Sequence, residues 1–456
     1  MKKIITSLLL LTILNAKSQT IALDQTFGTN GITSIPLIGE GDDLQIQISQ
    51  DNKILATGKD LPASTSVNPN KIYKLNLDGS LDTSFGNLGT LILPNYSGDF
   101  KAVLQGSDKF LIVFQSINNT APNFRAILRY NLNGTLDTTF GTNGETQIPF
   151  AGVTGFRFNN LIILSDNSII IADGVKYTKL SSNGIIDNSY GTSGVINQAN
   201  SANIQNQGSN LLNFYSSKIE STTTNGTLIN GYGTAGIYNY PNASDYFSKI
   251  TSSGNVNSLD LNSNLFYNMS PTGSLINTIN LTNDSNSLDY YIDEVFDGSK
   301  YFFVGSSSIP QPFIVCYDVN GNLIQLNGSN SYKESSITEG NATSILISNN
   351  SLYVGGDKVD STNKWFYTIS KYNFTTLGTN EVKTQNLISF ENPITNKLNF
   401  QTKEKISKIE IYSTSGNLVK NIISNNSDVS ELAKGIYVLK IILQNGKIIS
   451  TKVIKK

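Results

Sequence analysis

Short apolar runs and polar turns recur along most of this chain. From Asp42 onward each unit holds an apolar stretch, a tight turn of Asp, Asn, Gly or Ser, and a second, almost wholly apolar run. Runs without polar residues are typical of strands that are covered on both faces. Seven turns are expected, at Asp51-Asn52, Ser107-Asp108, Asp166-Asn167, Gly208-Ser209, Asn262-Ser263, Gly298-Ser299 and Asn349-Asn350. The second strands that follow them are expected at Lys53–Gly58, Lys109–Phe114, Ser168–Gly174, Asn210–Tyr215, Asn264–Met269, Lys300–Gly305 and Ser351–Gly355.

A third strand in each unit alternates between apolar and polar residues. Tyr73 and Leu75 alternate with Lys74 and Asn76, for example. These strands end in a turn dipeptide: Asp78-Gly79, Asn133-Gly134, Asn183-Gly184, Asn225-Gly226, Thr272-Gly273 or Asn320-Gly321. Asn-Gly and Asp-Gly favour the two left-handed positions of a type I′ hairpin turn, so we expect a fourth strand to fold straight back.

One motif recurs in the segment that leads to the fourth strand. It reads Leu-Asp-Thr-Thr-Phe-Gly-Thr-Asn-Gly at Leu136–Gly144, with further copies at Leu23–Gly31, Leu81–Gly89, Ile186–Gly194 and, more weakly, Leu228–Gly236. We expect its Leu and its aromatic residue to fill the gap to the neighbouring unit. Its Asp should hydrogen-bond the local backbone together with the Ser or Thr two positions later. The recurring positions are therefore interpreted as structural: Asp24, Phe27, Gly28, Asp82, Phe85, Gly86, Asp137, Phe140, Gly141, Asp187, Tyr190 and Gly191.

The units predict an all-β fold, a seven-bladed β-propeller of four-stranded antiparallel blades over residues 19–380. The last unit runs to Trp365–Asn373 and then lacks the motif, whereas the chain carries a copy near its start. We expect residues 23–37 to supply the outer strand of the last blade, which would close the ring and remove an unpaired edge. An open array or a ring of six or eight blades stays an alternative, because the fourth and fifth units are degenerate.

The motif resembles a known repeat. Together with the preceding Tyr-Asn-Leu-Asn-Gly-Thr at 130–135, it is similar to the delta-60 β-propeller repeat of bacterial surface and secreted proteins. The resemblance implies a propeller. It implies no reaction, and it brings no catalytic residues.

The start of the chain has the pattern of a cleaved signal peptide, which we place at 1–18. Lys2 and Lys3 precede an apolar run from Ile4 to Leu14, and the small residues Ala16 and Ser18 follow it. The apolar run is shorter than the ~20 residues of a membrane-spanning helix, which disfavours a membrane anchor.

Residues 381–456 predict a small β-domain that we interpret as an immunoglobulin-like sandwich. Strands are expected at Lys397–Gln401, Lys408–Ser413, Leu418–Ile423, Gly435–Leu443 and Lys447–Val453. The order of motifs resembles the C-terminal sorting domain of type IX secretion, carried by Asn392, Pro393, Gly416, Asn417, Gly435, Tyr437, Lys452, Lys455 and Lys456. The resemblance implies recognition by the type IX machinery. It also implies cleavage of the domain, with release of the body or its attachment to surface lipopolysaccharide.

The amino-acid composition excludes several kinds of functional site. The chain has no His and a single Cys, Cys316, so imidazole-based catalysis, zinc sites that need His and an intrachain disulfide are excluded. Residues 385–456 hold 11 Lys against 5 Asp plus Glu, while the whole chain has a net charge of −1. The body is therefore mildly acidic and offers no basic footprint for nucleic acid.

A few residues are candidates for chemistry or binding. A polysaccharide hydrolase would need a pair of converging carboxylates, for which the candidates are Asp293, Glu294, Glu334 and Glu339. Aromatic residues expected to be exposed, and able to stack on a sugar or a partner, are Tyr290, Tyr291, Trp365 and Tyr367. The loops 60–70 and 117–124 are longer insertions and the first places to look for recognition.

Two other sites are disfavoured. Segments 76–82 and 318–322 loosely resemble calcium loops, but neither has the full ligand spacing with a distal Glu, and a hairpin explains both. Arg125, Arg129 and Arg157 do not have the distribution over separate blades that an arginine triad for a carboxylate needs. No catalytic, metal or cofactor residue is therefore assigned.

We expect a monomeric, secreted or cell-surface module that binds a protein or glycan ligand without catalysing a reaction. A surface polysaccharide hydrolase and a structural surface or matrix component are the alternatives, which a fold alone does not separate.

Overall fold

The computed structural model describes residues 18–61, 70–94, 100–116, 124–149, 161–172, 176–197, 203–251, 253–281, 290–306, 311–334, 336–337, 339–376, 388–390, 392–402, 405–413, 418–423, 426–444 and 448–456. The expected signal peptide lies outside them, except for Ser18. The chain divides into two compact units, Met1–Leu377 and Gly378–Lys456.

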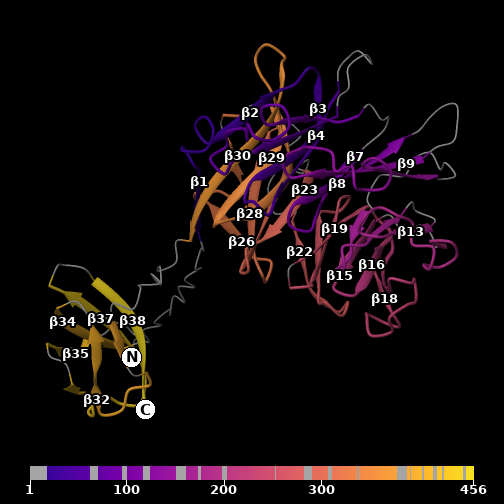
Figure 1. Cartoon of the computed structure of the whole chain (residues 1–456). Helices are drawn as coiled ribbons and strands as arrows, with labels where there is room; N and C mark the ends of the chain where they lie inside the picture. The colour runs from indigo at the N-terminus through magenta and orange to yellow at the C-terminus, as the bar shows by residue number, and fades with distance from the viewer. Residues whose placement is uncertain are drawn as a thin grey trace, which may run out of the picture. The chain divides into compact units, whose positions relative to one another are not determined.

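The larger unit consists of four-stranded antiparallel arrays, or blades, that follow one another along the chain (Figure 1). In blades 1 to 5, four consecutive strands pair in chain order. Blade 1 holds β3 (Glu40–Ile48), β4 (Ile54–Leu61), β5 (Asn70–Leu75) and β6 (Thr90–Ile92); blade 2 holds β7 (Phe100–Gln105), β8 (Lys109–Ser116), β9 (Phe124–Asn131) and β10 (Glu145–Pro149). Blade 3 holds β11 (Leu161–Ile163), β12 (Ile169–Ala172), β13 (Lys176–Leu180) and β14 (Val195–Asn197). Blade 4 holds β15 (Asn203–Gln207), β16 (Asn210–Phe214), β17 (Lys218–Thr223) and β18 (Ile237–Asn239), and blade 5 holds β19 (Tyr246–Ile250), β20 (Val256–Asp260), β21 (Leu265–Met269) and β22 (Leu275–Asn280).

The last two blades are joined by the N-terminal segment. Blade 6 holds β23 (Tyr290–Phe296), β24 (Lys300–Ser306), β25 (Pro312–Asp318) and β26 (Leu323–Leu326), and the short β27 (Tyr332–Lys333) also pairs with β25. Blade 7 holds β28 (Gly340–Ser348), β29 (Ser351–Val359) and β30 (Trp365–Thr376), and its fourth strand is β2 (Ile32–Pro36). The N-terminal segment thus completes the last blade, as the sequence predicts. In addition, β1 (Ser18–Leu23) pairs with β30 and with β26, which the sequence did not indicate.

The first strands of successive blades lie next to one another. Side chains of these strands bond the following or preceding blade at Gln47–Ala102, Gln105–Asn167, Asn206–Ile163, Gln205–Ser248, Lys249–Glu294 and Asp293–Ile345. Between blade 7 and blade 1, Thr343 Oγ1 donates to the Leu44 carbonyl oxygen at 2.8 Å. The described blades therefore form a closed succession with the first strands innermost.

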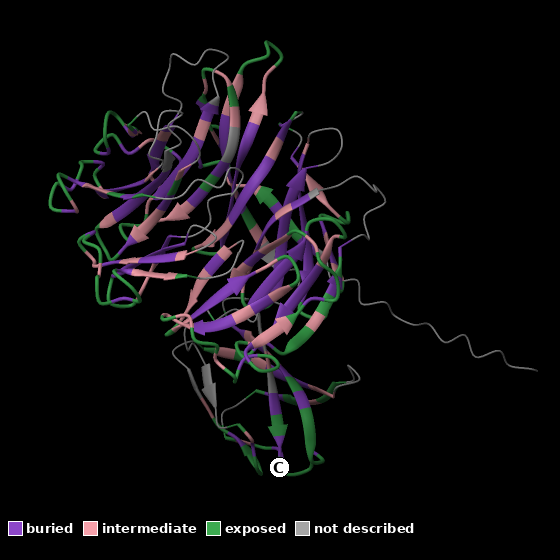
Figure 2. Ribbon diagram, turned by 90° about the vertical axis from the view of Figure 1, so that its right-hand side faces the viewer, coloured by how far each residue is buried: buried purple, intermediate pink, exposed green. Residues whose placement is uncertain are grey.

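The apolar core is distributed between neighbouring blades. Phe85 of blade 1 packs with Phe110 and Phe114 of blade 2, and Phe140 of blade 2 packs with Ile169 of blade 3. The blade strands are accordingly mostly buried, with exposed residues concentrated at turns (Figure 2). Because each blade is covered on both faces, its central strands need apolar residues at consecutive positions.

Two expectations about the repeat are wrong. In blade 5 the run 264–269 is the third strand, β21, and not the second, because β20 already occupies the second position. The Asn-Gly and Asp-Gly turns have one left-handed residue, the Gly, as at Gly79 with φ +85°. They are therefore not type I′ turns; Gly79 N donates to Asn76 O and Asn76 N donates to Ser80 O, which makes a three-residue hairpin loop. The third-strand residues Lys74 and Arg129, which alternate with apolar residues, are both buried.

The smaller unit has a four-stranded antiparallel sheet in the order β35 (Leu418–Ile422), β34 (Ile406–Ser413), β37 (Gly435–Leu443) and β38 (Ile448–Lys455). Two short pairs accompany it, β31 (Ile388–Phe390) with β33 (Phe400–Thr402) and β32 (Lys397–Leu398) with β36 (Ser427–Asp428). One face of the main sheet packs on Ile394, Leu398 and Val429. The expected strand Lys397–Gln401 is divided between β32 and β33, which pair with different strands. The other four expected strands are present, some with shifted ends, and the immunoglobulin-like topology stays a prediction. Neither unit has a helix among the described residues that is long and apolar enough to span a bilayer.

Candidate functional site

The recurring motif forms a polar network at the boundary between two blades. Asp137 Oδ1 accepts hydrogen bonds from the Thr139 backbone N at 3.1 Å and from Thr139 Oγ1 at 2.6 Å. The same contacts recur for Asp24 with Thr26, Asp82 with Ser84 and Asp187 with Ser189. The second oxygen of each carboxylate is left to bind a cation.

A Lys or Arg supplies that cation in four copies of the motif. The pairs are Lys371–Asp24 at 2.8 Å, Lys53–Asp82 at 2.6 Å, Arg129–Asp137 at 2.8 Å and Lys179–Asp187 at 3.3 Å. Burial alone would raise the pKa of Asp137, but the hydrogen bonds from Thr139 and the charges of Arg129 and Lys109 lower it below its usual value. We call these contacts the boundary ion pairs.

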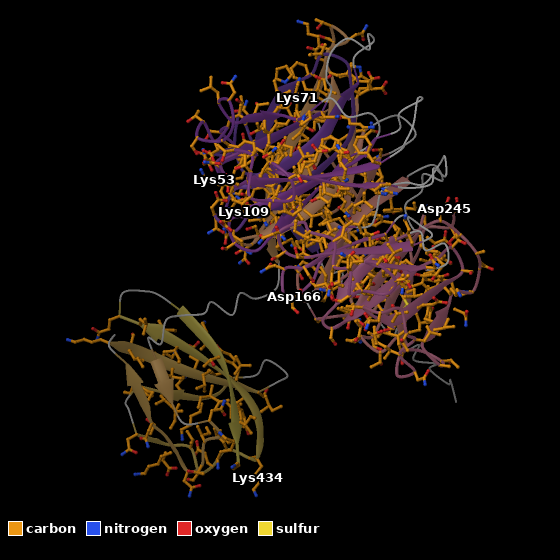
Figure 3. The ribbon with its side chains drawn as sticks, turned by 45° about the vertical axis from the view of Figure 1, so that its right-hand side comes forward. Lys53, Lys71, Lys109, Asp166, Asp245 and Lys434 are labelled. Carbon is orange, nitrogen blue, oxygen red and sulfur yellow. The ribbon has the colours of Figure 1, made fainter. Side chains whose placement is uncertain are left out.

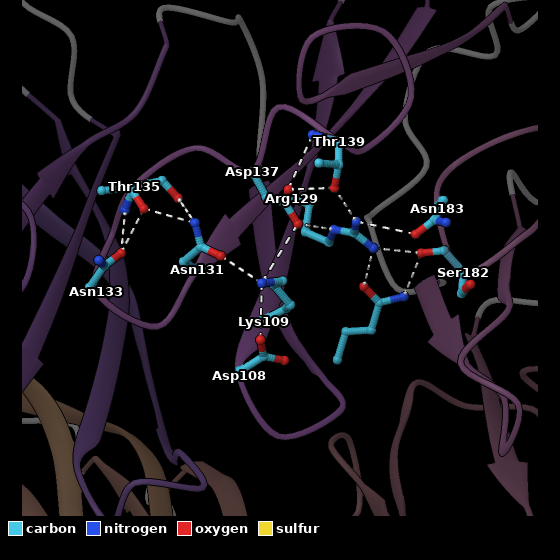
Figure 4. A network of polar contacts seen from close by, with 11 residues as sticks. Asp108, Lys109, Arg129, Asn131, Asn133, Thr135, Asp137, Thr139, Ser182 and Asn183 are labelled. Carbon is cyan, nitrogen blue, oxygen red and sulfur yellow. Dashed lines mark hydrogen bonds and ion pairs between the residues drawn. The ribbon is translucent and has the colours of Figure 1, made fainter.

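Arg129 shows how a boundary ion pair reaches the next blade (Figure 4). Its guanidinium donates to Ser182 O at 2.7 Å and to Asn183 Oδ1 at 3.3 Å, both in the hairpin turn of blade 3. It also lies 4.9 Å from the centre of the Phe140 ring. In blade 1, Lys74 Nζ makes the corresponding contact with Leu132 O of blade 2 at 2.6 Å. Arg129 therefore joins its own motif to the neighbouring blade, whereas Lys74 is paired with Asp51 and the motif carboxylate Asp82 with Lys53.

The motif glycine also binds the next blade. Gly141 N donates to Asn183 O at 2.8 Å, and Gly86 and Gly28 make the same bond with Asn133 and Asp78. A Cβ on Gly184 would lie 2.6 Å from the Phe140 ring, so only glycine fits the turn at this distance. The motif aromatics Phe27, Phe85, Phe140 and Tyr190 are all buried between blades.

The expectation for the motif leucine is wrong for Leu136, although Leu81 packs in part against the core between blades 7 and 1. Leu136 is 38% exposed, and the Gly144 Cα lies so close that a Cβ there would meet the Leu136 side chain at 2.7 Å. The leucine therefore covers its own motif rather than filling the gap to the next blade.

The fifth copy of the motif has lost its ion pair. Ile229 stands at the Asp position, and its backbone N donates to Ser221 O at 2.9 Å. Asp137 N makes the equivalent bond with Arg129 O, so Ser221 stands at the cation position. The hydroxyls of Ser221 and Tyr232 are buried, and neither has a hydrogen-bond partner within the described part of the chain. The anion and the cation are thus absent together at this boundary.

The acids proposed for a hydrolase do not form an accessible pair. Asp293 and Glu294 lie on β23 and are both 4% exposed. Asp293 forms an ion pair with Lys249 of blade 5 and accepts from Ile345 N of blade 7 at 3.0 Å. Glu334 is also buried, and its carboxylate accepts hydrogen bonds from Tyr332 and Ser336. Glu339 is exposed.

Glu294 has an unusual pKa. Burial raises its pKa to about 6, against the charge of Lys249 and the hydrogen bond from Asn257, which lower it. Asn257 Nδ2 donates to Oε1 at 3.0 Å, and Oε2 is buried without a partner within the residues described. A raised pKa is a feature of catalytic acids, but here the carboxyl group is enclosed between blades 5 and 6.

The aromatic residues expected to be exposed are not a surface patch. Tyr291 and Tyr367 are buried, and their hydroxyls donate to the backbone of Leu281 and Lys59. Trp365 is half-buried, and the side chain of Tyr290 lies outside the described residues. Tyr291 and Tyr367 lie on blade strands. A neighbouring blade covers the face of the strand that would otherwise be exposed to solvent, and the sequence alone does not show this.

A different group of tyrosines reaches the surface. Tyr238 and Tyr246 are half-buried, and Tyr246 stacks on Tyr240 with ring centres 3.7 Å apart. Tyr215 and Lys218, also half-buried, lie in the same region of blade 4, with the Lys218 ammonium 4.9 Å from the Tyr215 ring. The only signal in the sequence is the density of tyrosines between 232 and 246.

The other expected site residues have structural contacts. Asp78 Oδ1 accepts from Ser80, and Asp318 Oδ1 from Asn320 and Asn322, so the suspected calcium turns are hydrogen-bonded within themselves. No group of three or more Asp, Glu, Cys or His side chains that could hold a metal ion occurs in the described ranges. Arg125 is buried on β9 beside Arg129, Cys316 is buried, and Arg157 and the loops 62–69 and 117–123 lie outside these ranges.

The sorting-domain residues lie around strands β37 and β38. Asn392 Oδ1 accepts from Ile454 N at 2.9 Å, and Tyr437 is buried with its hydroxyl donating to Ala433 O. Lys455 is buried and bonds the Lys456 carbonyl oxygen. Pro393 precedes Ile394, Gly435 begins β37, and Lys452 lies within β38, while Gly416 and Asn417 are not among the described residues.

Two family models match this chain. Residues 390–456 match the secretion system C-terminal sorting domain, and residues 49–85 and 118–140 match the domain of unknown function (DUF5122) beta-propeller. No curated protein sequence matches.

Solved structures with a similar backbone have low sequence identity to this chain. The WD40 beta propeller domain of Doa1 is 12% identical, with a TM-score of 0.40 over 74% of this chain and 97% of that one. A protein of unknown function from Bacteroides caccae is 11% identical, with a TM-score of 0.36 over 62% and 94%. The strand topology and the two family matches together make this chain a β-propeller protein with a C-terminal sorting domain of type IX secretion.

Proposed function

We propose that this protein is an exported recognition module, which binds a protein or glycan ligand through one face of its propeller and catalyses no reaction. The sorting domain supports export by the type IX machinery to the cell surface or the medium. Removal of an N-terminal signal peptide after Ser18, and release or attachment to lipopolysaccharide, belong to the proposal.

The two faces of the propeller are used differently. Antiparallel order places the turns between first and second strands, and between third and fourth strands, on one face, which we call the turn face. The recurring motif, its boundary ion pairs and the Gly turns all lie there. The other connections leave from the opposite, connector face. In Figure 3, Lys53, Lys109 and Asp166 mark the turn face, and Lys71 and Asp245 mark the connector face.

The single observation that carries the proposal is the group of partly exposed tyrosines at the connector face of blades 4 and 5. Tyr246 begins β19, and Tyr238 lies opposite Ile219 near the start of β17, so both are at this face. Tyrosine offers a rigid apolar ring and a hydroxyl group, which suits both protein and glycan ligands. The insertions 60–70 and 117–124 join second to third strands, so they leave from the same face.

The carboxylates of Asp293 and of four motif copies, in contrast, form ion pairs within the propeller. Asp293 is paired with Lys249, and the motif carboxylates are paired with Lys or Arg. A hydrolase needs carboxyl groups that contact its substrate. The buried pair Asp293 and Glu294 is therefore better explained as a contact between blades, and the hydrolase is the competing hypothesis that the experiment addresses.

The test is a screen of the purified mature chain against glycans and surface proteins, scored for binding and for product release in the same wells. We expect binding without products, and a loss of about tenfold in affinity for Tyr238→Ala or Lys218→Ala, the effect of one interface contact of roughly 1.4 kcal/mol. Ile185→Ser is the matched control, because Ile185 is 59% exposed on the turn face. Product release that Glu294→Gln abolishes would establish the hydrolase instead. Absence of both binding and products would favour a structural component.

A further inference from the structure

The sorting domain leaves one face of its main sheet uncovered. On β37, Tyr437, Leu439 and Ile441 point to the core and are buried, whereas Ile436 and Val438 point to the other side and are 43% and 38% exposed. Alternate residues of a strand face opposite sides, so the second set belongs to the face away from the core.

Apolar residues that lie opposite Ile436 and Val438 on neighbouring strands extend this set over four strands. Val438 lies opposite Tyr412 of β34, which in turn lies opposite Leu418 of β35, 49% exposed. Ile436 lies opposite Ile454 of β38, also 43% exposed. Directly opposed residues point to the same side of a sheet. Tyr412, Leu418, Ile436, Val438 and Ile454 therefore form one contiguous surface, which we call the outer face.

Cations lie beside the outer face. Glu410 lies next to Tyr412 and is bonded by Lys408 at 2.7 Å and by Lys440 at 3.2 Å, each with its side chain more than a third exposed. Residues 385–456 as a whole carry a surplus of Lys, 11 against 5 acids. An apolar surface with a basic border is complementary to an apolar surface with an acidic border.

We propose that the outer face is the surface by which this domain docks on the type IX secretion machinery, on a component that presents an apolar patch bordered by carboxylates. The inference rests on the export function that the sorting-domain match supports. A contiguous exposed apolar surface on a soluble domain marks an interaction site. Since the other face of the sheet is filled by Ile394, Leu398 and Val429, the outer face is the apolar surface left for a partner among the described residues of this unit.

The test places an acid in the outer face of the full chain, as Val438→Glu and, separately, Ile454→Glu, in a bacterium with type IX secretion. Both side chains are partly exposed, so the fold tolerates the change, while a carboxylate that is buried against an apolar partner is strongly unfavourable. We expect export to fall at least about tenfold, with the retained chain accumulating in the periplasm as resistant to protease as the wild type.

Two controls keep the result specific. Ile423→Glu changes a residue that is 80% exposed just beyond β35, and Val319→Glu changes one that is 44% exposed in the propeller; both should be exported at the wild-type level. Wild-type export of Val438→Glu and Ile454→Glu would overturn the proposal, and so would an equal loss in the controls. A wild-type chain that sediments as a dimer, with monomeric but normally exported Val438→Glu, would assign the outer face to a second copy. Export of a chain that lacks 390–456 would contradict the export function itself.

Discussion

Arg129 Nε donates a hydrogen bond of 2.8 Å to Asp137 Oδ2, and both side chains are buried at the boundary of blades 2 and 3. The two residues are far from solvent because the next blade covers them, and the guanidinium also bonds Ser182 of that blade. The pair is thus part of the contact between blades.

Replacing Arg129 by Met should destabilise the propeller by about 3–5 kcal/mol, because the buried Asp137 loses its closest partner and keeps only Lys109, 3.8 Å away, as a counter-charge. The measurement is the free energy of unfolding in urea at neutral pH. Lys109→Met is the matched control: its Nζ lies 3.8 Å from the same carboxylate oxygen and its side chain is 26% exposed. The control should cost less than about 1 kcal/mol. Equal losses in the two variants would contradict a special role of Arg129.

If the two charged residues of an ion pair are introduced together at the fifth copy of the motif, their effects on stability should not be additive. Ser221→Arg and Ile229→Asp each bring a charge without a partner to the boundary of blades 4 and 5, so each alone should lower the melting temperature. In the double variant the charges meet in the geometry of the other copies, and we expect a favourable coupling of about 0.5–3 kcal/mol in a double-mutant cycle. Additive losses would show that the boundary has repacked around Tyr232 and excludes the pair.

Gly184→Ala should destabilise the protein more than Gly208→Ala. Both glycines have positive φ, +79° and +68°, so each variant pays for a left-handed alanine, about 1–2 kcal/mol. A Cβ on Gly184 would also lie 2.6 Å from the Phe140 ring, whereas a Cβ on Gly208 meets nothing within 4 Å. Overpacking should add about 1–3 kcal/mol at Gly184. Urea unfolding of both variants measures the difference, and equal costs would argue against a tight contact between motif and turn.

Glu294 should make the stability of the propeller fall as pH rises. Burial raises its pKa to about 6 from an ordinary value of 4.5, so the folded chain holds this proton more tightly than the unfolded chain. The associated stability is complete below pH ~4.5 and is lost as pH rises through about 6, a change of roughly 2 kcal/mol.

The Glu294→Gln variant has no ionisable group at this position. Its free energy of unfolding, relative to that of the wild type, should therefore increase by roughly 2 kcal/mol between pH 4 and pH 8. Unfolding in urea across this range measures the effect. Glu339→Gln removes the same type of charge at an exposed position and is the control. A parallel pH dependence of Glu294→Gln and the wild type would show that Glu294 is not the group responsible.

The sequence predicts what depends on local periodicity. The turns before the second strands, the recurring motif, its Asp-to-Thr hydrogen bonds and the closure of blade 7 by β2 all follow from short segments that repeat. The pattern also separates the sorting domain from the repeats. These features are readable because each unit repeats the same local chemistry with the same spacing.

What the sequence does not predict depends on which blade covers which strand. Tyr367 was expected to be exposed, but its hydroxyl group donates to the Lys59 carbonyl oxygen of blade 1, which follows blade 7 in the ring. Lys74 alternates with apolar residues as a solvent-facing residue would, yet it is buried. Its ammonium group donates hydrogen bonds to Leu132 O of blade 2 and to Asp51. The partly exposed Tyr238 and Tyr246 were missed for the same reason, since exposure at a blade boundary is decided by the neighbouring blade.

The pairing of β2 with β30 has a consequence for how complete molecules are distinguished from shortened ones. Ile35 lies opposite Tyr367, so blade 7 is assembled from positions near opposite ends of the propeller region. During synthesis the early strand has no partner until β30 has been translated, and the export address at 390–456 is made only after that point. A ribosome that stops early yields a chain that lacks the address whenever it lacks the closing strand. Type IX export would therefore pass only chains that are long enough to close their ring.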